Sequence, residues 1–463
     1  MILIWLKIIL ALLLVWPRGY LLIYLIDRTK SFSFGFKFFV GWLLGLAGFT
    51  LDVFAALTFG GQSLTPIVLL LSGTSQIVGF SFMIFLFERK LVLPQFKQIS
   101  PFIKRQLGSL KSFSNLEKIV LTLLLLTLAV RLFSGVWQIT NVPTYDFDAW
   151  NNWNLRAKVI YTENKIPLDQ SGYFYLGGGI RSYPLNDALV KVWFAKVAGE
   201  FSDRVINNAS LIYYLLLLLI FYFTLPKEIS RLIKLVSIYL LSSVPFLYFH
   251  SHVPYADLYY SIFLFISVVA LFNFLSDKGL SFFYLSGIAG AFAIWTKNEG
   301  LSILLPILLT VSFWLVLTKR IKVKDFLLHW FFAALTIAPW LAFRVIYKLD
   351  VLSGDSSSFN LVFNSQFSGE IFSSIFLRSH FNLLFILFFG FGILRFKDFY
   401  RDLPLRFLFS IITILFLFNN AIIIFTDKAY DLSAVTRLNL QLVPLIMFAL
   451  VFFYYQSFVK MKS

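Results

Sequence analysis

The sequence predicts an all-α integral membrane protein with about thirteen transmembrane helices, and three observations support this class. Of the 463 residues, 59% are hydrophobic and only 14% are charged, so the chain lacks the charged surface that a soluble protein of this length needs. Most of its apolar runs approach the roughly 20 residues that span a bilayer as a helix. Because these runs are continuous and do not alternate with polar residues, helices are favoured over the strands of a barrel.

The apolar runs give the expected order of the spanning helices. They lie at 3–25, 38–59, 66–87, 119–140, 205–225, 235–249, 256–275, 282–295, 301–317, 326–346, 381–394, 405–425 and 438–455. The runs 282–295 and 381–394 are short for a span. The first run contains Lys7 and lacks a small-residue cleavage site, so we expect a retained helix and no signal peptide.

The Lys and Arg residues divide unevenly between alternate loops. One set of loops holds 24 of them, at 27–37, 88–118, 226–234, 276–281, 318–325, 395–406 and the C-terminal tail. The other set holds 12, at 141–204, 251–255, 296–300, 347–379 and 426–437. Since positive residues concentrate on the cytoplasmic side, the first set is predicted inside and the second outside a bacterial-type plasma membrane.

The distribution of ionisable residues divides the chain into two predicted transmembrane parts joined by a linker. Residues 1–87 predict three transmembrane helices with few ionisable groups, and 88–118 predict a basic cytoplasmic linker. Residues 119–463 predict a second transmembrane module, whose first outer loop, 141–204, is the longest polar segment and carries interfacial helices. We expect the module boundary to fall within the linker.

The charge and residue counts exclude several classes of protein. A formal net charge of +17 is explained by positive residues scattered in short loops, so we expect no nucleic-acid partner. The chain has no cysteine and therefore no disulfide or thiolate chemistry. Its four histidines show no zinc-binding spacing, so no metal site is predicted. A divalent cation held by outer carboxylates stays open, although no spacing demands one.

The segment 144–161, at the start of the large outer loop, carries the densest group of polar and aromatic side chains. Wound as a helix from Asp148, it places Trp150 and Trp153 on one face and Asp148 and Arg156 on the other. This pattern predicts a helix lying flat at the membrane–water interface. Asp148 could simply cap this helix, but the surrounding Trp, Asn and Arg residues favour a functional role for it and for Asp146.

Other polar groups gather in the remaining outer loops, and each has a plain structural alternative. Asp257 could stabilise a helix N-terminus, Lys297 and Glu299 could belong to a solvated turn, and Arg437 could reach toward lipid head groups. A substrate pocket at the membrane edge would also use such groups. The further members of the predicted pocket are Trp150, Trp153, Tyr183, His250, His252 and Tyr255.

Several segments together resemble the polytopic GT-C glycosyltransferases, specifically the bacterial relatives of protein O-mannosyltransferases and aminoarabinose transferases (glycosyltransferase family 39-like). The resemblance covers about residues 119–456 and rests on the order and sidedness of its motifs. These motifs are Phe147-Asp-Ala-Trp150 with Trp153 and Arg156-Ala-Lys158, Ser182-Tyr-Pro-Leu185, Tyr255-Ala-Asp257, Thr296-Lys-Asn-Glu-Gly300, and Arg437 before Pro444.

The resemblance implies transfer of a sugar from a polyprenyl-phosphate carrier to an acceptor hydroxyl on the outer face. It implies Asp148 as the catalytic base, with Asp146 second. The leaving phosphate needs cationic donors, and the candidates are Arg156, Lys158, Lys297 and Arg437. One displacement with one base would invert the anomeric centre. The expected partners are the lipid-linked donor, membrane lipids and an acceptor that is a lipid, a glycan or a protein.

Three other classes compete with this interpretation. An O-antigen ligase or polymerase usually has its large outer loop late in the chain, whereas here it is early. A lipid-linked sugar transporter or flippase would need ionisable groups near the midplane of its helices; Asp52 and Arg131 are the main residues of this kind. A non-catalytic scaffold would not need the outer polar cluster.

Overall fold

The computed structural model describes residues 2–27, 29–88, 99–349, 361–426 and 433–456. All regular secondary structure in these ranges is helical, and the one β feature within them is an isolated bridge between Leu361 and Thr426. The predicted all-α class is therefore confirmed.

Nine helices in the described part of the chain are long and apolar enough to cross a membrane, which fits a multi-pass membrane protein. Seven are single helices: α1 (Ile2–Ile26), α2 (Phe34–Thr58), α3 (Pro66–Glu88), α6 (Asn115–Asn141), α13 (Asp257–Leu275), α16 (Val323–Ile346) and α20 (Leu403–Phe425). Two are formed by consecutive helices: α9 (Asp203–Ile206) with α10 (Asn208–Thr224), and η3 (Gly300–Leu304) with α15 (Leu305–Leu317). Each coincides with one of the predicted apolar runs.

The other four predicted runs are helical but short or broken, so the count of thirteen spans stays a prediction. They correspond to α11 (Arg231–Ser242) with α12 (Pro245–Phe249), to α14 (Leu280–Thr296), to α18 (Leu384–Leu394), and to α21 (Ser433–Leu440) with α22 (Val443–Tyr454). The last pair is bent by 47° and would make a tenth span. Pro245 is the first residue of α12 and Pro444 the second residue of α22, positions in the first helical turn where a residue without an N–H group is tolerated.

Shorter helices lie between the spans. They are α5 (Ile99–Leu110), η1 (Ala149–Asn154), α7 (Leu155–Glu163), η2 (Tyr175–Gly177), α8 (Asn186–Ala198), η4 (Ser365–Phe367), α17 (Ser368–Phe372), η5 (Ser373–Leu377) and α19 (Phe396–Arg401). The predicted outer loop 141–204 thus contains several helices, as expected. The predicted linker 88–118 contains α5, and its residues 89–98 lie outside the described residues.

The chain folds into two compact units. The N-terminal unit comprises Met1–Gly179, Leu185–Ala209 and Leu215–Tyr239. The C-terminal unit comprises Leu240–Ser463 and two short earlier segments, Ile180–Pro184 and Ser210–Tyr214. The predicted module boundary within 88–118 stays a prediction.

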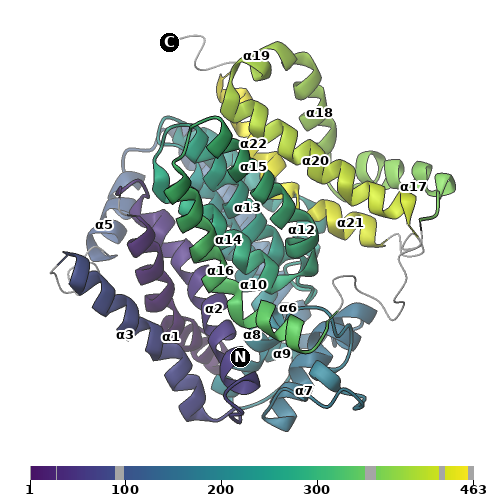
Figure 1. Ribbon diagram of the computed structural model, residues 1–463. Helices are drawn as coiled ribbons and strands as arrows, with labels where there is room; N and C mark the ends of the chain where they lie inside the picture. The colour runs from purple at the N-terminus through teal and green to yellow at the C-terminus, as the bar shows by residue number, and fades with distance from the viewer. Residues whose placement is uncertain (1, 28, 89–98, 350–360, 427–432, 457–463) are drawn as a thin grey trace. The chain divides into compact units, whose positions relative to one another are not determined.

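In the N-terminal unit, α1 and α2 pack side by side with α3 (Figure 1). Glycines allow the close approach of the first two helices: a Cβ atom on Gly19 would collide with the carbonyl oxygen of Gly41, and one on Gly45 would collide with that of Val15. Gly41 and Gly45 have the spacing that brings transmembrane helices into backbone contact.

An ion pair between the buried Arg18 and the partly buried Asp52 connects these three helices. Arg18 Nη2 lies 2.9 Å from Asp52 Oδ2, and Gln76 donates to Asp52 Oδ1 at 2.9 Å. Arg18 Nη1 also donates to the carbonyl oxygen of Ser72 at 3.0 Å. A charge inside a membrane helix is costly unless it is paired. Here Arg18 lies in α1, Asp52 lies in α2, and both Ser72 and Gln76 lie in α3.

Contacts at the helix ends of the N-terminal unit agree with the predicted alternation of loops. At one end, the Leu64 N–H donates to the Asn164 carbonyl oxygen at 2.6 Å, which joins two loops predicted outside. At the other end, the ring centroids of Phe34 and Phe102 are 4.9 Å apart, and Arg231 lies 3.5 Å from Glu117. These four residues come from segments predicted to be cytoplasmic.

In the C-terminal unit, α13 is the central helix and packs against α14, α20 and α22 (Figure 1). Nearly all of α13 is buried. The hydroxyl of Tyr284 donates to Asp325 at 3.0 Å at the end predicted to be cytoplasmic. The site described below lies at the opposite end of α13, near Asp257.

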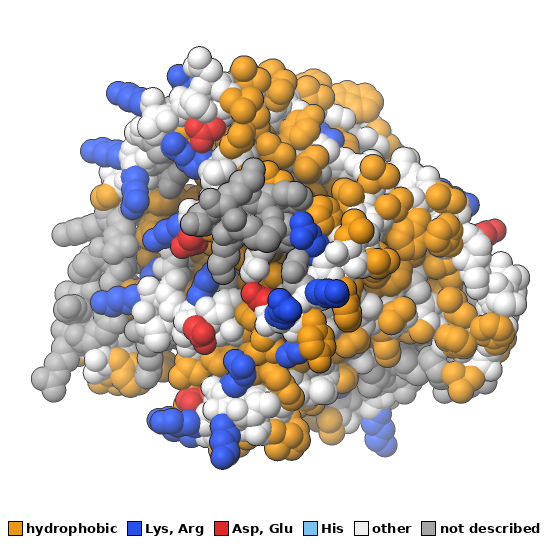
Figure 2. All heavy atoms as spheres, turned by 90° about the horizontal axis from the view of Figure 1, so that it is seen from above, with side chains coloured by type: hydrophobic (Ala, Val, Ile, Leu, Met, Phe, Trp, Pro, Cys, Tyr) orange, Lys and Arg blue, Asp and Glu red, His pale blue; other side chains and the backbone are white. Residues whose placement is uncertain are grey.

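Large hydrophobic side chains remain exposed on many of the long helices. On α6, the side chains of Val130 and Phe133 are 67% and 73% exposed. Figure 2 shows hydrophobic side chains over a broad part of one face, with Lys and Arg side chains gathered beside them. Exposed apolar patches of this kind on helices of spanning length are suited to contact with lipid.

Candidate functional site

Three charged side chains form a buried ionic cluster at the predicted outer end of the C-terminal unit. Lys297 Nζ lies 2.8 Å from Asp257 Oδ1 and 2.8 Å from Glu299 Oε1. Asp257 and Lys297 are almost completely buried, and Glu299 is only partly exposed. Asp257, Lys297 and Glu299 together form the ionic cluster.

Local backbone structure places the three groups together. Asp257 is the first residue of α13, where the helix dipole favours a negative charge. Lys297 caps the C-terminus of α14, and Glu299 directly precedes η3. Gly300 lets this turn fold tightly onto α14, because a Cβ atom there would lie 2.5 Å from the Ile294 nitrogen. The turn predicted from 296–300 therefore holds both a cation and a carboxylate.

The charges of the ionic cluster depend on one another. Burial alone would lower the pKa of Lys297, but the negative charges of Asp257 and Glu299 outweigh it and raise this pKa above its usual value. Among the described residues, the second carboxylate oxygens, Asp257 Oδ2 and Glu299 Oε2, are buried without a hydrogen-bond partner. Two buried acceptor oxygens are thus available to a polar ligand.

Aromatic and cationic side chains surround the ionic cluster. The ring of Tyr183 lies beneath Lys297 Nζ at 5.8 Å, and the ring of Tyr255 lies beneath the Arg437 guanidinium at 5.1 Å. The positive charge of Arg437 acts on both Lys297 and His250. Gln441, at the break between α21 and α22, donates to Asp257 Oδ1 at 3.2 Å.

The two predicted histidines have different surroundings. His250 is fully buried, its Nδ1 lies 3.0 Å from the Phe246 carbonyl oxygen, and its ring is 5.5 Å from that of Tyr255. Burial lowers the pKa of His250 to about 4, against the opposing charge of Asp257. His252 packs on the ring of Tyr248, and burial lowers its pKa to about 4 as well. Both imidazoles are therefore neutral at pH 7.

A second set of contacts ties the segment 180–184 to the turn that carries Lys297. Arg344 Nη1 donates to the Ser182 carbonyl oxygen and to Asn298 Oδ1, each at 3.2 Å. Its Nη2 donates to the Leu349 carbonyl oxygen at 3.2 Å. Sequence analysis assigned Arg344 to a spanning run and missed it; its position in the last turn of an apolar helix was the available signal.

The first-loop residues belong to the N-terminal unit, where the predicted two-faced helix is wrong in detail. Residues 149–154 form a π-helix before α7, so the 3.6-residue period does not hold there. As a result, Trp153 is buried while Trp150 is 47% exposed. Asp148 precedes the π-helix but makes no capping hydrogen bond with it. Asp146 is partly buried, and burial raises its pKa.

Arg156 was expected on an outward polar face and is instead 1% exposed. Its Nε donates to the Leu176 carbonyl oxygen at 3.2 Å. The glycine loop wraps closely over it, since a Cβ atom on Gly177 would lie 2.9 Å from the Arg156 Cα atom. Burial lowers the pKa of Arg156 to about 9, while the charge of Asp187 opposes this change. Lys158, by contrast, is exposed.

Within the C-terminal unit, the structure brings together most of the residues predicted there from separate motifs. The group comprises Tyr183, His250, Tyr255, Asp257, Lys297, Glu299 and Arg437. The predicted residues of the N-terminal unit are Asp146, Asp148, Trp150, Trp153, Arg156 and Lys158. Gln441 and Arg344 are the additions that sequence analysis missed.

Comparison of the chain with protein-family models, curated proteins and solved structures gives no match. Within the described ranges, no three His, Asp or Glu side chains are grouped as metal ligands would be.

Proposed function

We propose that this protein is a membrane glycosyltransferase that moves a sugar from a polyprenyl-phosphate donor to an acceptor hydroxyl at the outer membrane–water interface. One observation carries the proposal: four segments far apart in sequence meet around the ionic cluster. These segments are 180–184, 250–257, 296–300 and the last turn of α21 with Arg437. Each contributes a motif of the resemblance to GT-C glycosyltransferases.

The cations of this site suit the leaving group of the reaction. Cleavage of a polyprenyl-phosphate sugar leaves a phosphate, and nearby fixed positive charges stabilise it as it forms. Arg437 and Lys297 can supply these charges, and Asp257 and Glu299 keep Lys297 protonated. Arg437 can also donate two parallel hydrogen bonds to a phosphate, which a lysine cannot do.

The proposed base removes the proton of the acceptor hydroxyl. Asp148 is the first candidate and Asp146 the second, because the resemblance assigns this role to the first outer loop. The raised pKa of Asp146 favours a general base, whose ideal pKa lies near the working pH. Glu299 is a further candidate, since its Oε2 atom is buried and unpaired among the described residues. With one base and one displacement, the transfer inverts the anomeric centre.

A lipid-linked sugar flippase is the second candidate function, and one observation favours it. Arg18 and Asp52 form an ion pair inside two helices of spanning length, and ionisable groups inside a membrane often mark a transport path. Gln76 and Ser72 complete the hydrogen bonds of this pair, which is also what a purely structural pair would need.

Purified protein in liposomes separates the two functions. The liposomes contain polyprenyl-phosphate donors labelled in the sugar, carrying mannose, glucose or aminoarabinose, and a cell-envelope extract supplies acceptors. A transferase moves the label from the lipid to an acceptor and releases polyprenyl phosphate. A flippase leaves the label on the lipid and changes only its leaflet. Label that stays lipid-linked with every donor, while it does change leaflet, would overturn the proposed transfer.

A further inference from the structure

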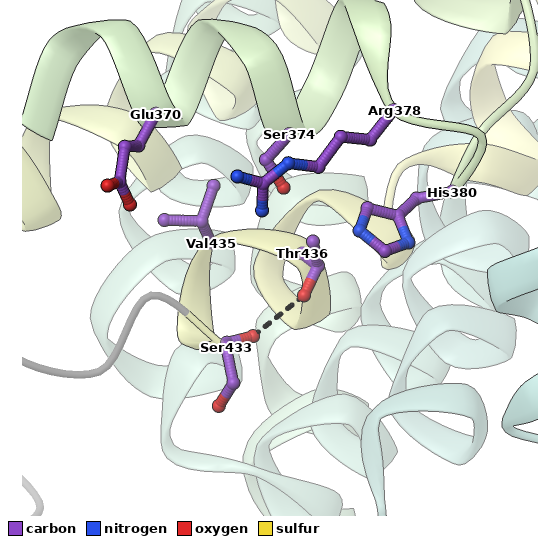
Figure 3. Close-up of a pocket in the computed structure, with 7 residues that line it drawn as sticks. All are labelled: Glu370, Ser374, Arg378, His380, Ser433, Val435 and Thr436. Atoms are coloured by element: carbon purple, nitrogen blue, oxygen red, sulfur yellow. Dashed lines mark hydrogen bonds between the residues drawn. The ribbon is translucent and has the colours of Figure 1, made fainter.

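A polar pocket of about 190 Å³ lies in the C-terminal unit, outside the group of residues described above (Figure 3). Six polar side chains line it: Glu370, Ser374, Arg378, His380, Ser433 and Thr436. Val435 is its apolar member. None of these residues was singled out from the sequence.

Two helical segments in contact with each other supply four of the polar side chains, and Arg378 and His380 come from the turn that follows η5. Glu370 and Ser374 come from α17 and η5, four residues apart, so they share one side of a helical segment. Ser433 and Thr436 come from the first turn of α21, and Thr436 Oγ1 donates to the Ser433 carbonyl oxygen at 2.9 Å (Figure 3). In Figure 3, the guanidinium of Arg378 extends across the middle of the group.

The pocket has a buried floor and a charged rim. Ser374 and Thr436 are each only 7% exposed, whereas Glu370 and Arg378 are exposed. Burial and the nearby charge of Arg378 lower the pKa of His380, which keeps its imidazole neutral at pH 7. A neutral imidazole has one donor and one acceptor nitrogen. The walls therefore offer an anion, a cation, a neutral ring and hydroxyl groups within one small volume.

This mixture of groups selects a class of ligand. A bare phosphate would be attracted by Arg378 but repelled by Glu370, and a cation would be attracted by Glu370 but repelled by Arg378, so neither charge is favoured by the pocket as a whole. An apolar ligand would cover the Ser374 hydroxyl without offering it a hydrogen-bond partner. A sugar avoids all three problems, because each of its hydroxyls both donates and accepts. Glu370 can accept from such hydroxyls, Arg378 can donate to them, and the serine and threonine hydroxyls can do both.

We propose that this pocket binds carbohydrate through the hydroxyls of one sugar residue. Thr436 lines the pocket and its neighbour in α21, Arg437, belongs to the group around the ionic cluster. The bound carbohydrate is the sugar of the acceptor. This last assignment rests on the proposed transfer reaction, whereas the binding of carbohydrate rests on the pocket alone.

Because the chain contains no cysteine, a single introduced thiol reports on the pocket without interference. Ser374→Cys places a thiol on the buried floor, and Ser368→Cys, at an exposed position of α17, is the matched control. The rate of reaction with a small methanethiosulfonate reagent is measured in detergent with methyl glycosides of glucose, mannose and N-acetylglucosamine, or with inorganic phosphate. This readout does not require catalysis.

Carbohydrate binding predicts that at least one glycoside slows the Ser374→Cys reaction in a saturable manner, by about tenfold at ten times its Kd. The Ser368→Cys reaction should be unchanged. Adding Glu370→Gln to Ser374→Cys should reduce the protection. Protection by phosphate and not by any glycoside would overturn the proposal, as would equal rates with and without every glycoside.

A kinetic test addresses the acceptor assignment separately. If the reaction is the proposed transfer, Glu370→Gln should raise the acceptor KM about tenfold and leave kcat for bound acceptor within about twofold. Glu163→Gln, at an exposed position of the N-terminal unit, should change neither. Unchanged acceptor KM would overturn the acceptor assignment. If a glycoside protects the thiol of Ser374→Cys but the protein never cleaves the donor, the proposed function is overturned. The carbohydrate pocket is then still supported.

Discussion

Lys297 and Asp257 are 40 residues apart in sequence, yet Lys297 Nζ lies 2.8 Å from Asp257 Oδ1 in the buried end of the C-terminal unit. The pair joins the turn after α14 to the first residue of α13, and Glu299 binds the same ammonium group at 2.8 Å. Removal of the Lys297 ammonium group would leave the carboxylates of Asp257 and Glu299 without a compensating positive charge.

Replacement of Lys297 by methionine should therefore destabilise the fold strongly. Breaking a buried ion pair from one side costs about 3–5 kcal/mol, so Lys297→Met should lower the thermal unfolding midpoint in detergent. Lys324→Met, at an exposed position in the first turn of α16, is the control and should stay near wild type. Equal midpoints for the two variants would contradict the structural role of Lys297.

The neutral form of His250 predicts a pH dependence of stability. Its pKa is lowered from 6.5 to about 4 in the folded protein, chiefly by burial. The unfolded state therefore takes up the proton first, and stability present above pH 6.5 is lost as the pH falls toward 4, by about 3 kcal/mol for this residue. His250→Gln should make the thermal unfolding midpoint less dependent on pH between 6.5 and 4. A slope identical to wild type would show that another group is responsible.

The ion pair between α1 and α2 should behave differently when one or both partners are removed. Arg18→Leu leaves the Asp52 carboxylate, which is 26% exposed, without its cation and should cost up to about 3 kcal/mol of stability. The double variant Arg18→Leu, Asp52→Leu should recover most of that loss, because neither charge remains. Size-exclusion chromatography after heating measures the folded fraction. A double variant as unstable as the single variant would mean that the hydrogen bonds to Gln76 and Ser72 dominate.

The predicted orientation is testable with single thiols in this cysteine-free chain. Ser171→Cys lies in the loop predicted outside, and Lys104→Cys lies in α5, which is predicted to be cytoplasmic; both positions are exposed. An impermeant thiol reagent should label only Ser171→Cys in intact cells and both variants after permeabilisation. Labelling of Lys104→Cys alone in intact cells would invert the topology.

Hydrophobic runs were sufficient to predict the helical class and most of the spanning helices, because each long run forms a helix by satisfying its own backbone. The same signal could not show that new helices begin at Pro245 and, one residue before Pro444, at Val443. It also could not reveal the glycine contact between Gly19 and Gly41, which depends on how two helices approach one another.

Site residues were predictable where a charge interrupts an apolar pattern near a loop, as for Asp257 and Lys297. Arg344 and Gln441 lie inside or beside apolar runs, and their roles come from partners far away in sequence. Arg156 shows the opposite failure. Its position in a helical wheel predicted exposure, but the π-helix before it and the glycine loop over it lead to burial.

The transfer rate of an Asp148 variant tests most directly whether the protein transfers sugar and whether Asp148 is the general base. Asp148→Asn keeps the size of the side chain and removes its charge, and because the Asp148 side chain makes no capping hydrogen bond, the change should leave the following helix intact. In the liposome assay with labelled donor, a general base predicts a folded protein whose transfer rate falls by roughly 10²–10⁴-fold. Asp146→Asn should cost less if that residue only positions the acceptor. Near-normal transfer by Asp148→Asn, with loss of transfer in Asp146→Asn or Glu299→Gln, would contradict the assignment and place the base at one of those two carboxylates.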